Sequence, residues 1–304
     1  MFLLSTVILF VSIHMTSAFL AAAGRTTVFQ PHVQTLLLPP AYRFPSRQFS
    51  RTMLKQNSRA TPEVEDGKIS VLCLHGKGNN GDSFQKILTP LENYLKTTKL
   101  DFQFDYLTAP FSMNDKDDSE DTKREMQWWS LPPGVRSYNA NEYKGFEESA
   151  QLVENELQNK HYDFILGHSQ GAILLSALMT CDSWTGRIGE KEPLGYILNG
   201  CAWPNPYTDQ LESYSYSPDA KQDSAGSGCK PKALFIIGEN DAINPPEGAK
   251  RVRDILKKGG LEVDTFHHGG GHSVPVQDGL DVHEIATWIY DVASSTSTAS
   301  YRYA

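Results

Sequence analysis

A serine with the surroundings of a nucleophile occurs at position 169. It is the third residue of GHSQG at 167–171, which follows the pattern G-x-S-x-G. An apolar run precedes this segment at 162–166, and a helix-like run follows it at 172–179. A strand that ends where a helix begins makes the backbone turn sharply at the serine, and small residues two positions to either side allow the two elements to approach closely. The context predicts a strained serine whose hydroxyl is exposed at a helix N-terminus.

A serine hydroxyl is a poor nucleophile at neutral pH, so it needs a histidine base and an acid that orients that base. The chain order serine, acid, histidine is one of the known orders for such a triad. Asp241 follows the apolar run 233–237, and a carboxylate just past a strand end faces the crevice where open α/β sheets bind ligands. Asp241 is favoured over Glu239, the rival acid, and over a purely structural role as a turn or N-cap residue.

The histidine expected to complete the triad is His272, within HHGGGHSVP at 267–275. Three glycines would let this loop carry an imidazole over the edge of the sheet. His267 and His268 compete for the same role, and three neighbouring histidines also raise the alternative of a metal site. No clear pattern for a third ligand accompanies them, so no metal is predicted.

An oxyanion formed by attack of the serine needs two backbone N–H donors. Gln170, directly after the serine, is the expected first donor, and Lys77, in the glycine-rich segment HGKGNNG at 75–81, is the expected second. Neither G-x-x-x-x-G-K-[ST] nor G-x-G-x-x-G occurs in this chain, which disfavours nucleotide binding. Trp128 and Trp129 have two interpretations: an apolar wall for an acyl chain, or packing in the core.

The elements that must position these residues alternate between strand and helix patterns. Strands are expected at 68–75, 102–107, 162–166, 194–198, 233–237 and 262–266, and helices at 83–96, 143–157, 172–179, 246–257 and 280–292. This alternation predicts an α/β fold with a mainly parallel sheet covered on both faces. Polar residues at 114–125 predict a solvated loop, and the aperiodic segment 205–228 predicts a loop or a small lid-like insertion.

The first 62 residues differ in composition from the rest of the chain. They contain six basic residues and neither Asp nor Glu. An apolar run at 2–13 is too short to span a membrane and is typical of a signal peptide, with small residues for cleavage before Phe19. We therefore expect a signal peptide at 1–18 and a disordered, transit-like presequence at 19–62. This arrangement resembles the bipartite presequences of algae with secondary plastids and predicts a plastid location. The alternative is a secreted or endoplasmic reticulum protein with a disordered linker.

The remaining chain is acidic and long enough for one large domain. It carries 22 basic against 36 acidic residues, which argues against nucleic acid and anionic membrane surfaces as partners. The four cysteines show no paired spacing, so buried free thiols are expected rather than a disulfide framework. We expect the domain at 63–296 and a disordered tail at 297–304, without stable membrane insertion of the mature chain.

Taken together, these motifs resemble the eukaryotic FSH family of serine hydrolases, α/β-hydrolases that include the ovarian-cancer-associated hydrolase and its fungal relatives. The matching motifs occur in the order of the family between residues 68 and 289: LHG at 74–76, TAP at 108–110, WW at 128–129, YKG at 143–145, GHSQGA at 167–172, GEND at 238–241 and GGHSVP at 270–275.

The resemblance implies the α/β-hydrolase fold, a triad of Ser169, Asp241 and His272, and hydrolysis of small-molecule alkyl or acyl esters without a cofactor. Two departures bear on the substrate. The segment 76–81 is richer in glycine than the family pattern and is similar to acyl-protein thioesterases and carboxylesterases, and the segment 205–228 is longer than the fold needs. An acyl-thioesterase or lysophospholipase is therefore the alternative within the same fold, and a non-catalytic binding protein is the alternative of a different class.

Overall fold

The central element of the structure, a computed structural model, is a six-stranded parallel sheet. The structure describes residues 68–114, 124–181, 192–215, 230–277 and 279–300, with side chains up to residue 295. The signal peptide and presequence expected at 1–62 lie outside these residues, as do most of the loop expected at 114–125 and the second half of 205–228. The strands have the order β2-β1-β5-β6-β7-β8 and are β1 Lys68–Leu74, β2 Asp101–Leu107, β5 Phe164–His168, β6 Gly195–Asn199, β7 Lys232–Gly238 and β8 Glu262–His268.

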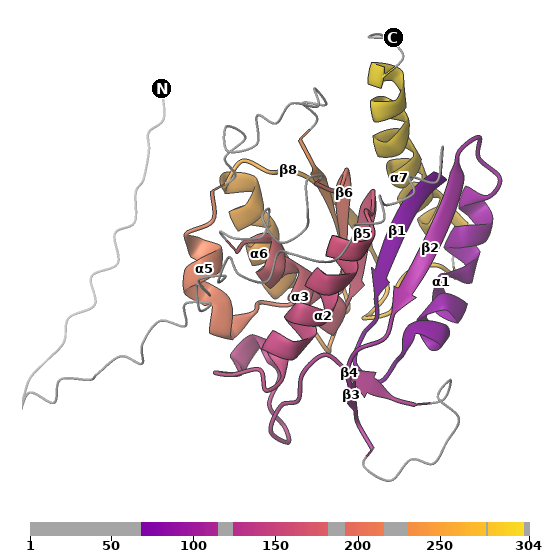
Figure 1. Cartoon of the computed structure of the whole chain (residues 1–304). Helices are drawn as coiled ribbons and strands as arrows, with labels where there is room; N and C mark the ends of the chain where they lie inside the picture. Colours follow the sequence, from indigo (N-terminus) through magenta and orange to yellow (C-terminus); the bar gives the residue numbers. More distant parts are fainter. Residues whose placement is uncertain (1–67, 115–123, 182–191, 216–229, 278, 301–304) are drawn as a thin grey trace, which may run out of the picture. The chain divides into compact units, whose positions relative to one another are not determined.

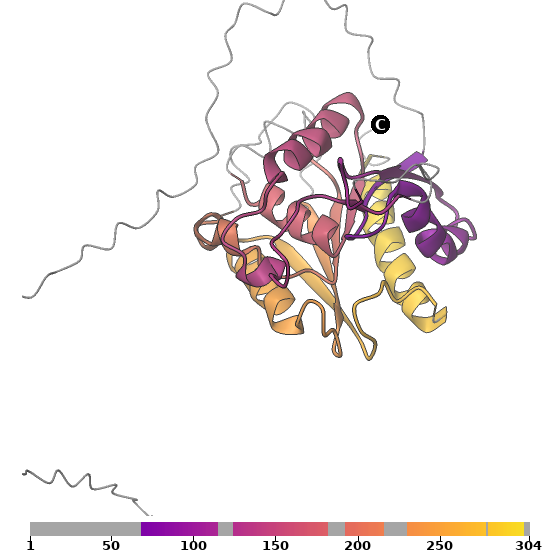
Figure 2. The same ribbon diagram turned by 90° about the horizontal axis from the view of Figure 1, so that it is seen from below.

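Helices cover both faces of this sheet because its side chains alternate between two apolar cores. On β1, for example, Leu72 belongs to one core and Val71 to the other. One face packs against α1 and α7, and the opposite face packs against α2, α3 and α6 (Figures 1 and 2). These helices are α1 Gly81–Leu95, α2 Phe146–Asn159, α3 Gln170–Met179, α6 Pro246–Lys258 and α7 Gly279–Ser300. This arrangement confirms the predicted α/β fold with a parallel sheet covered on both faces.

The strand order reverses between β1 and β5, which places a crevice where their carboxyl ends meet. From β1 the chain continues to β2 on one side, and then returns to add β5 on the other. In open α/β sheets, ligands bind at this reversal, outside the carboxyl ends of the strands. The two segments that leave β1 and β5 are the glycine-rich segment 75–81 and the turn at Ser169, so both lie at the reversal.

Several short elements were not predicted from the sequence. A two-stranded antiparallel hairpin pairs β3 Phe111–Ser112 with β4 Met126–Gln127, and the 3-10 turn η3 lies at Ser137–Asn139. The segment expected to be aperiodic from residue 205 begins with the 3-10 turn η4 Asn205–Tyr207 and helix α5 Thr208–Glu212. Helix α7 continues to Ser300, into the segment 297–304 where we expected a disordered tail. None of the described helices is both long and apolar enough to span a bilayer.

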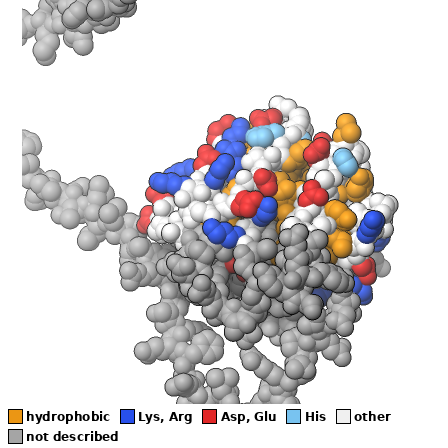
Figure 3. Space-filling view, turned by 90° about the horizontal axis from the view of Figure 1, so that it is seen from above, with side chains coloured by type: hydrophobic (Ala, Val, Ile, Leu, Met, Phe, Trp, Pro, Cys, Tyr) orange, Lys and Arg blue, Asp and Glu red, His pale blue; other side chains and the backbone are white. Residues whose placement is uncertain are grey.

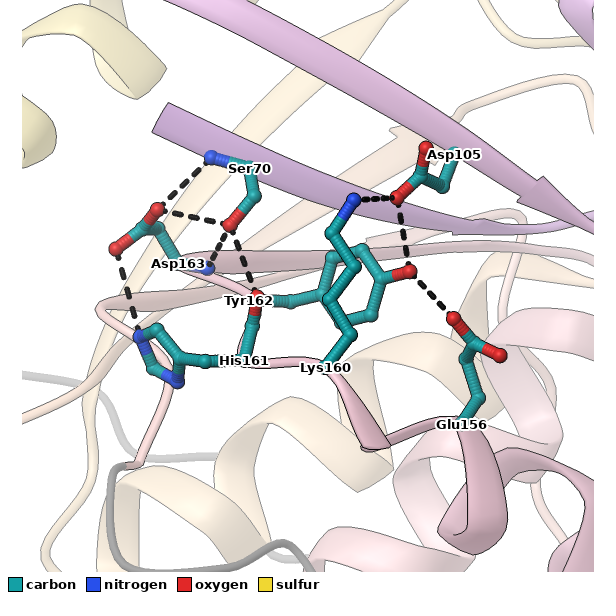
Figure 4. Close-up of polar contacts among 7 residues, drawn as sticks. All are labelled: Ser70, Asp105, Glu156, Lys160, His161, Tyr162 and Asp163. Atoms are coloured by element: carbon teal, nitrogen blue, oxygen red, sulfur yellow. Dashed lines mark hydrogen bonds and ion pairs between the residues drawn. The ribbon is translucent and has the colours of Figure 1, made fainter. Parts of the chain in front are cut away.

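At the amino ends of the strands, a polar cluster joins β1, β2 and the segment that leads into β5 (Figure 4). The carboxylate of Asp163 accepts hydrogen bonds from the backbone N–H and the hydroxyl of Ser70. The hydroxyl of Tyr162 lies 2.9 Å from a carboxylate oxygen of Asp105 and 2.6 Å from one of Glu156. These contacts tie neighbouring strands together at the end opposite to Ser169. Seen from that end, acidic and basic side chains are interspersed around apolar ones (Figure 3).

Candidate active site

Ser169 occupies the sharp turn between β5 and α3, as its motif predicts. Its backbone has φ 53° and ψ −115°, and it is the one non-glycine residue with positive φ in the described part of the chain. Such a conformation costs on the order of 1–3 kcal/mol and persists only when the surrounding structure enforces it. A Cβ atom on Gly171 would overlap the carbonyl oxygen of Leu74, and a Cβ atom on Gly167 would lie 2.7 Å from the backbone of Ala172. The two glycines therefore permit the close approach of strand and helix that holds the serine in this turn.

The imidazole of His272 lies between Ser169 and Asp241. Its Nε2 atom is 2.7 Å from the hydroxyl oxygen of Ser169, and its Nδ1 atom is 2.7 Å from Oδ2 of Asp241. The three residues follow β5, β7 and β8, which are three strands of one sheet. A close approach of the Gly200 backbone completes the site, since a Cβ atom there would lie 3.1 Å from the imidazole of His272.

Asp241 is buried, and both of its carboxylate oxygens have hydrogen-bond partners. While Oδ2 faces His272, Oδ1 accepts the backbone N–H groups of Ile243 and Asn244, both at 2.9 Å. Burial alone would raise the pKa of Asp241, but the hydrogen bond with His272 and those from Asn244 and Ile243 outweigh it and lower the pKa below its ordinary value. The ionised carboxylate can therefore hold a proton on Nδ1 of His272, which leaves Nε2 to accept the proton of the Ser169 hydroxyl.

The competing residues named from the sequence have other partners. Glu239 is exposed and lies 2.5 Å from His267, with Lys250 also nearby. His268 is buried and stacks on Phe266. The three histidines of the loop thus face different neighbours, and no cluster of three or more metal-ligating side chains occurs among the residues that the structure describes.

The segment after β1 runs directly beside the serine. A Cβ atom on Gly76 would lie 3.1 Å from Cβ of Ser169, so glycine allows this approach. His75, fully buried, anchors the segment: the N–H of Ala109 donates to its Nε2 at 2.9 Å, and its Nδ1 lies 2.8 Å from the carbonyl oxygen of Gly76. Desolvation lowers the pKa of His75 to about 4, so the ring is neutral and donates from Nδ1.

The two proposed oxyanion donors belong to two segments that leave neighbouring strands, α3 after β5 and the glycine-rich segment after β1. Gln170 is the first residue of α3, and the N–H of a first helical residue has no acceptor within its helix. Lys77 follows Gly76 in the segment after β1. The structure thus brings the backbone of both residues to the carboxyl edge of β1 and β5.

Trp128 and Trp129 do not form an exposed wall for an acyl chain. Both are fully buried, and Trp129 stacks on Tyr143 with ring centroids 4.5 Å apart. Of the two interpretations, packing in the core is therefore the one that the burial supports, because a side chain without accessible surface offers nothing to a ligand. Residue type alone could not distinguish the two roles, because tryptophan suits both a core and a ligand pocket.

Three polar residues of the site were missed in the sequence analysis. His168 is buried with its ring centroid 5.1 Å from that of His272, and Asn199 contacts its Nδ1 at 2.8 Å. Asn244 donates from its side chain to the carbonyl oxygen of Gly200 at 2.7 Å. Desolvation, followed by the proximity of His272, lowers the pKa of His168 to about 3, so this ring is neutral. Only the position of His168 beside the serine could have pointed to it.

A protein-family model and several curated proteins are similar to this chain. The model of the serine hydrolase (FSH1) family matches residues 65–282. An esterase of Aedes aegypti is 29% identical over 230 residues, covering 72% of this chain and 75% of its own length. The esterase OVCA2 of Danio rerio is 25% identical over 225 residues, covering 68% of this chain and 90% of its own.

Solved structures share the fold. A variant of the Arabidopsis thaliana protein SOBER1 is 18% identical with a TM-score of 0.50, and the match covers 74% of this chain and 99% of that one. The esterase PE8 is 17% identical with a TM-score of 0.50, and the match covers 74% of this chain and 93% of that one. With the family match spanning most of the described domain, the chain belongs to the FSH1 family of serine hydrolases, and it shares the fold of these solved structures.

Proposed function

We propose that this chain cleaves alkyl or acyl esters of carboxylic acids through a covalent acyl-enzyme formed on Ser169. The observation that carries the proposal is the continuous relay from Asp241 through His272 to the Ser169 hydroxyl, with 2.7 Å at each step. The esterases among the relatives support the same class of substrate. No cofactor takes part in the proposed reaction.

In the first half of the reaction, Nε2 of His272 accepts the proton of the Ser169 hydroxyl as Oγ attacks the substrate carbonyl carbon. The resulting oxyanion lies within reach of the N–H groups of Gln170 and Lys77, which lower the energy of this state more than that of the substrate. His272 then donates its proton to the leaving alkoxide. An alcohol departs, and the acyl group stays on Ser169.

In the second half, water replaces the alcohol. His272 removes a proton from the water as its oxygen attacks the acyl carbonyl, and returns that proton to Oγ of Ser169 as the carboxylic acid leaves. Asp241 keeps Nδ1 of His272 protonated throughout and stabilises the imidazolium that forms twice in each cycle.

Steady-state kinetics on a panel of oxygen esters, thioesters and lysolipids with graded acyl length would test this proposal. Ser169→Ala is the control, and we expect it to abolish both ester hydrolysis and labelling by a fluorophosphonate probe. Preference for thioesters or lysolipids would favour the alternative activities of the fold. A wild-type chain that the probe does not label would indicate a non-catalytic binding protein. Equal labelling of wild type and Ser169→Ala would refute the proposed nucleophile.

A further inference from the structure

The two oxyanion donors belong to segments that leave different strands, and their relative position must be held by a third element. We propose that Trp128 is a positioning residue that clamps the α3 N-terminus to the segment after β1 and so sets the geometry of the oxyanion site. This inference rests on the proposed function, since it concerns the stabilisation of the intermediate formed on Ser169. It gives the buried tryptophan a role other than contact with an acyl chain.

On the α3 side, the clamp holds the side chain of Gln170 at both of its polar atoms. The backbone N–H of Trp128 donates to Oε1 of Gln170 at 3.0 Å, and Nε2 of Gln170 donates to the carbonyl oxygen of Trp129 at 3.1 Å. Gln170 is 4% exposed, so water does not compete for these bonds. The residue that offers its backbone N–H to the oxyanion is thereby tied through its side chain to the tryptophan pair.

On the β1 side, the clamp reaches the residue that begins the glycine-rich segment. Nε1 of Trp128 donates to the carbonyl oxygen of His75 at 2.8 Å, and the two rings lie 5.3 Å apart. His75 in turn donates from Nδ1 to the carbonyl oxygen of Gly76, which also accepts the N–H of Asn79 at 3.2 Å. These bonds fix the direction of the Gly76 carbonyl.

The direction of that carbonyl determines the direction of the proposed donor. In a planar trans peptide, the C=O of Gly76 and the N–H of Lys77 point to opposite sides. Because the carbonyl is held by His75 and Asn79, the Lys77 N–H must point away from them. A rotated peptide would break both bonds to the carbonyl, so the clamp on His75 favours one orientation of the Lys77 amide.

The hairpin carries Trp128 to this position. The N–H of Gly78 donates to the carbonyl oxygen of Met126 at 2.9 Å, and the N–H of Met126 donates to the carbonyl oxygen of Asn79 at 3.0 Å. Strand β4 therefore runs alongside the glycine-rich segment, at the carboxyl end of β1 (Figure 1). Trp128 follows β4 directly, so its backbone and its indole can reach both segments at once.

The variant Trp128→Phe tests the clamp because it keeps an aromatic ring and removes the donor to His75. Oxyanion contacts act on the transition state, so we expect kcat to fall with little change in KM. The expected loss lies between about tenfold and the roughly 10²- to 10³-fold that the loss of one oxyanion donor costs. The pH profile of kcat/KM should keep its midpoint, because the clamp does not contact His272.

A matched control makes the same substitution of tryptophan by phenylalanine on helix α7. The indole of Trp288 on α7 donates to Asp264 at 2.8 Å, and Trp288→Phe should leave kcat and KM as in the wild type. Gln170→Met removes the other half of the clamp at similar side-chain length and should lower kcat in the same way. The double variant Trp128→Phe with Gln170→Met should lose less than the product of the two single losses, since both changes break one unit.

For each of these variants, kcat is calculated from the concentration of active sites, which is titrated with the fluorophosphonate probe. Unfolded protein therefore does not lower the value. Wild-type kcat per active site in both single variants would overturn the clamp, even if their melting temperatures fall, because the role would then be structural alone. A rise in KM at constant kcat would overturn it as well. Full activity of Ser169→Ala would instead overturn the proposed function, so the two failures are distinguishable.

Discussion

Nε2 of His272 lies 2.7 Å from Oγ of Ser169, although 103 residues separate the two in the chain. Each residue lies just beyond the carboxyl end of a strand, and parallel strands bring these ends to one edge of the sheet. The distance is that of a hydrogen bond. A histidine and a serine so placed can exchange a proton without any rearrangement of the backbone.

The acid that orients His272 should be Asp241 and not Glu239. In Asp241→Asn, the amide oxygen can still accept the N–H groups of Ile243 and Asn244, but the amide nitrogen would face Nδ1 of His272. The imidazole would then carry its proton on Nε2 and could not accept the serine proton. We expect kcat to fall by about 10³- to 10⁴-fold with an unchanged fold, measured by steady-state ester hydrolysis and circular dichroism.

The control for this prediction is Glu239→Gln, which alters the rival acid at the surface. Glu239 contacts His267 and Lys250, not His272, so kcat should not change. A large loss in Glu239→Gln together with an active Asp241→Asn would contradict the assignment.

The neutral buried histidines should make stability fall in mild acid. Desolvation lowers the pKa of His75 from 6.5 to about 4 and that of His168 to about 3. Between about pH 6.5 and 4, the unfolded chain binds these protons and the folded chain does not, so the free energy of unfolding decreases as pH falls. Each such proton contributes a slope of at most about 1.4 kcal/mol per pH unit, measurable by urea unfolding at a series of pH values.

The variant His168→Gln isolates one of these protons, because an amide does not titrate. Its free energy of unfolding should depend less steeply on pH than that of the wild type between about pH 6.5 and 4. An identical slope in the variant and the wild type would show that burial of this imidazole is not coupled to proton binding.

Gly171 should not tolerate a side chain. A Cβ atom at this position would overlap the carbonyl oxygen of Leu74 in β1, which a change of rotamer cannot relieve. We expect Gly171→Ala to lower the free energy of unfolding by at least about 1–3 kcal/mol and to reduce ester hydrolysis by displacing Ser169. At Gly279, by contrast, a Cβ atom would lie more than 4 Å from the other described residues outside its chain neighbours and the backbone of its own helix, so Gly279→Ala should melt at or above the wild-type temperature. Equal melting temperatures for Gly171→Ala and wild type would contradict the close approach of α3 and β1.

The polar cluster at the amino ends of the strands should support stability without affecting catalysis. Tyr162→Phe removes the hydroxyl that contacts Asp105 and Glu156, at the end of the sheet opposite to Ser169. We expect the free energy of unfolding to fall by about 1–2 kcal/mol, and kcat and KM to remain as in the wild type. The matched control is Tyr290→Phe on α7, since no hydrogen bond of the Tyr290 hydroxyl is seen within the described residues. A loss of kcat in Tyr162→Phe would mean that the two ends of the sheet are coupled.

The role of the first 62 residues in targeting is a proposal. We propose that they direct the protein to a plastid, on the basis of their apolar run at 2–13 and the acid-free, basic segment that follows. A fluorescent reporter fused behind residues 1–62 should enter the plastid in an alga with a secondary plastid. Secretion of the reporter, or its retention in the endoplasmic reticulum, would contradict the proposal and favour a plain signal peptide.

Sequence patterns did not predict the short elements, because these elements depend on contacts with residues that are distant in the chain. The pairing of β3 with β4 involves two residues on each strand, too few for a period of two to be recognised. Helix α5 has five residues, and it is buried at Leu211 against the core rather than defined by an amphipathic repeat of its own. Tyr143 shares the apolar stripe of α2 but precedes the helix, which begins at Phe146. Local propensity is a weak guide where tertiary contacts provide most of the stabilisation.

The sequence predicted the parallel α/β architecture and favoured Ser169, Asp241 and His272 over a rival acid and two rival histidines, because strand and helix periods and the turn around Ser169 are local properties of the chain. The burial of Trp128 and Trp129, and the positions of His75, His168 and Asn199 around the site, became visible in the folded chain. Their roles arise from hydrogen bonds between segments far apart in the chain, such as that of Trp128 with His75, and the residue types alone do not encode which partners will meet. The same indole that a sequence pattern could assign to a ligand pocket is, in the folded protein, enclosed between the two segments that flank the serine.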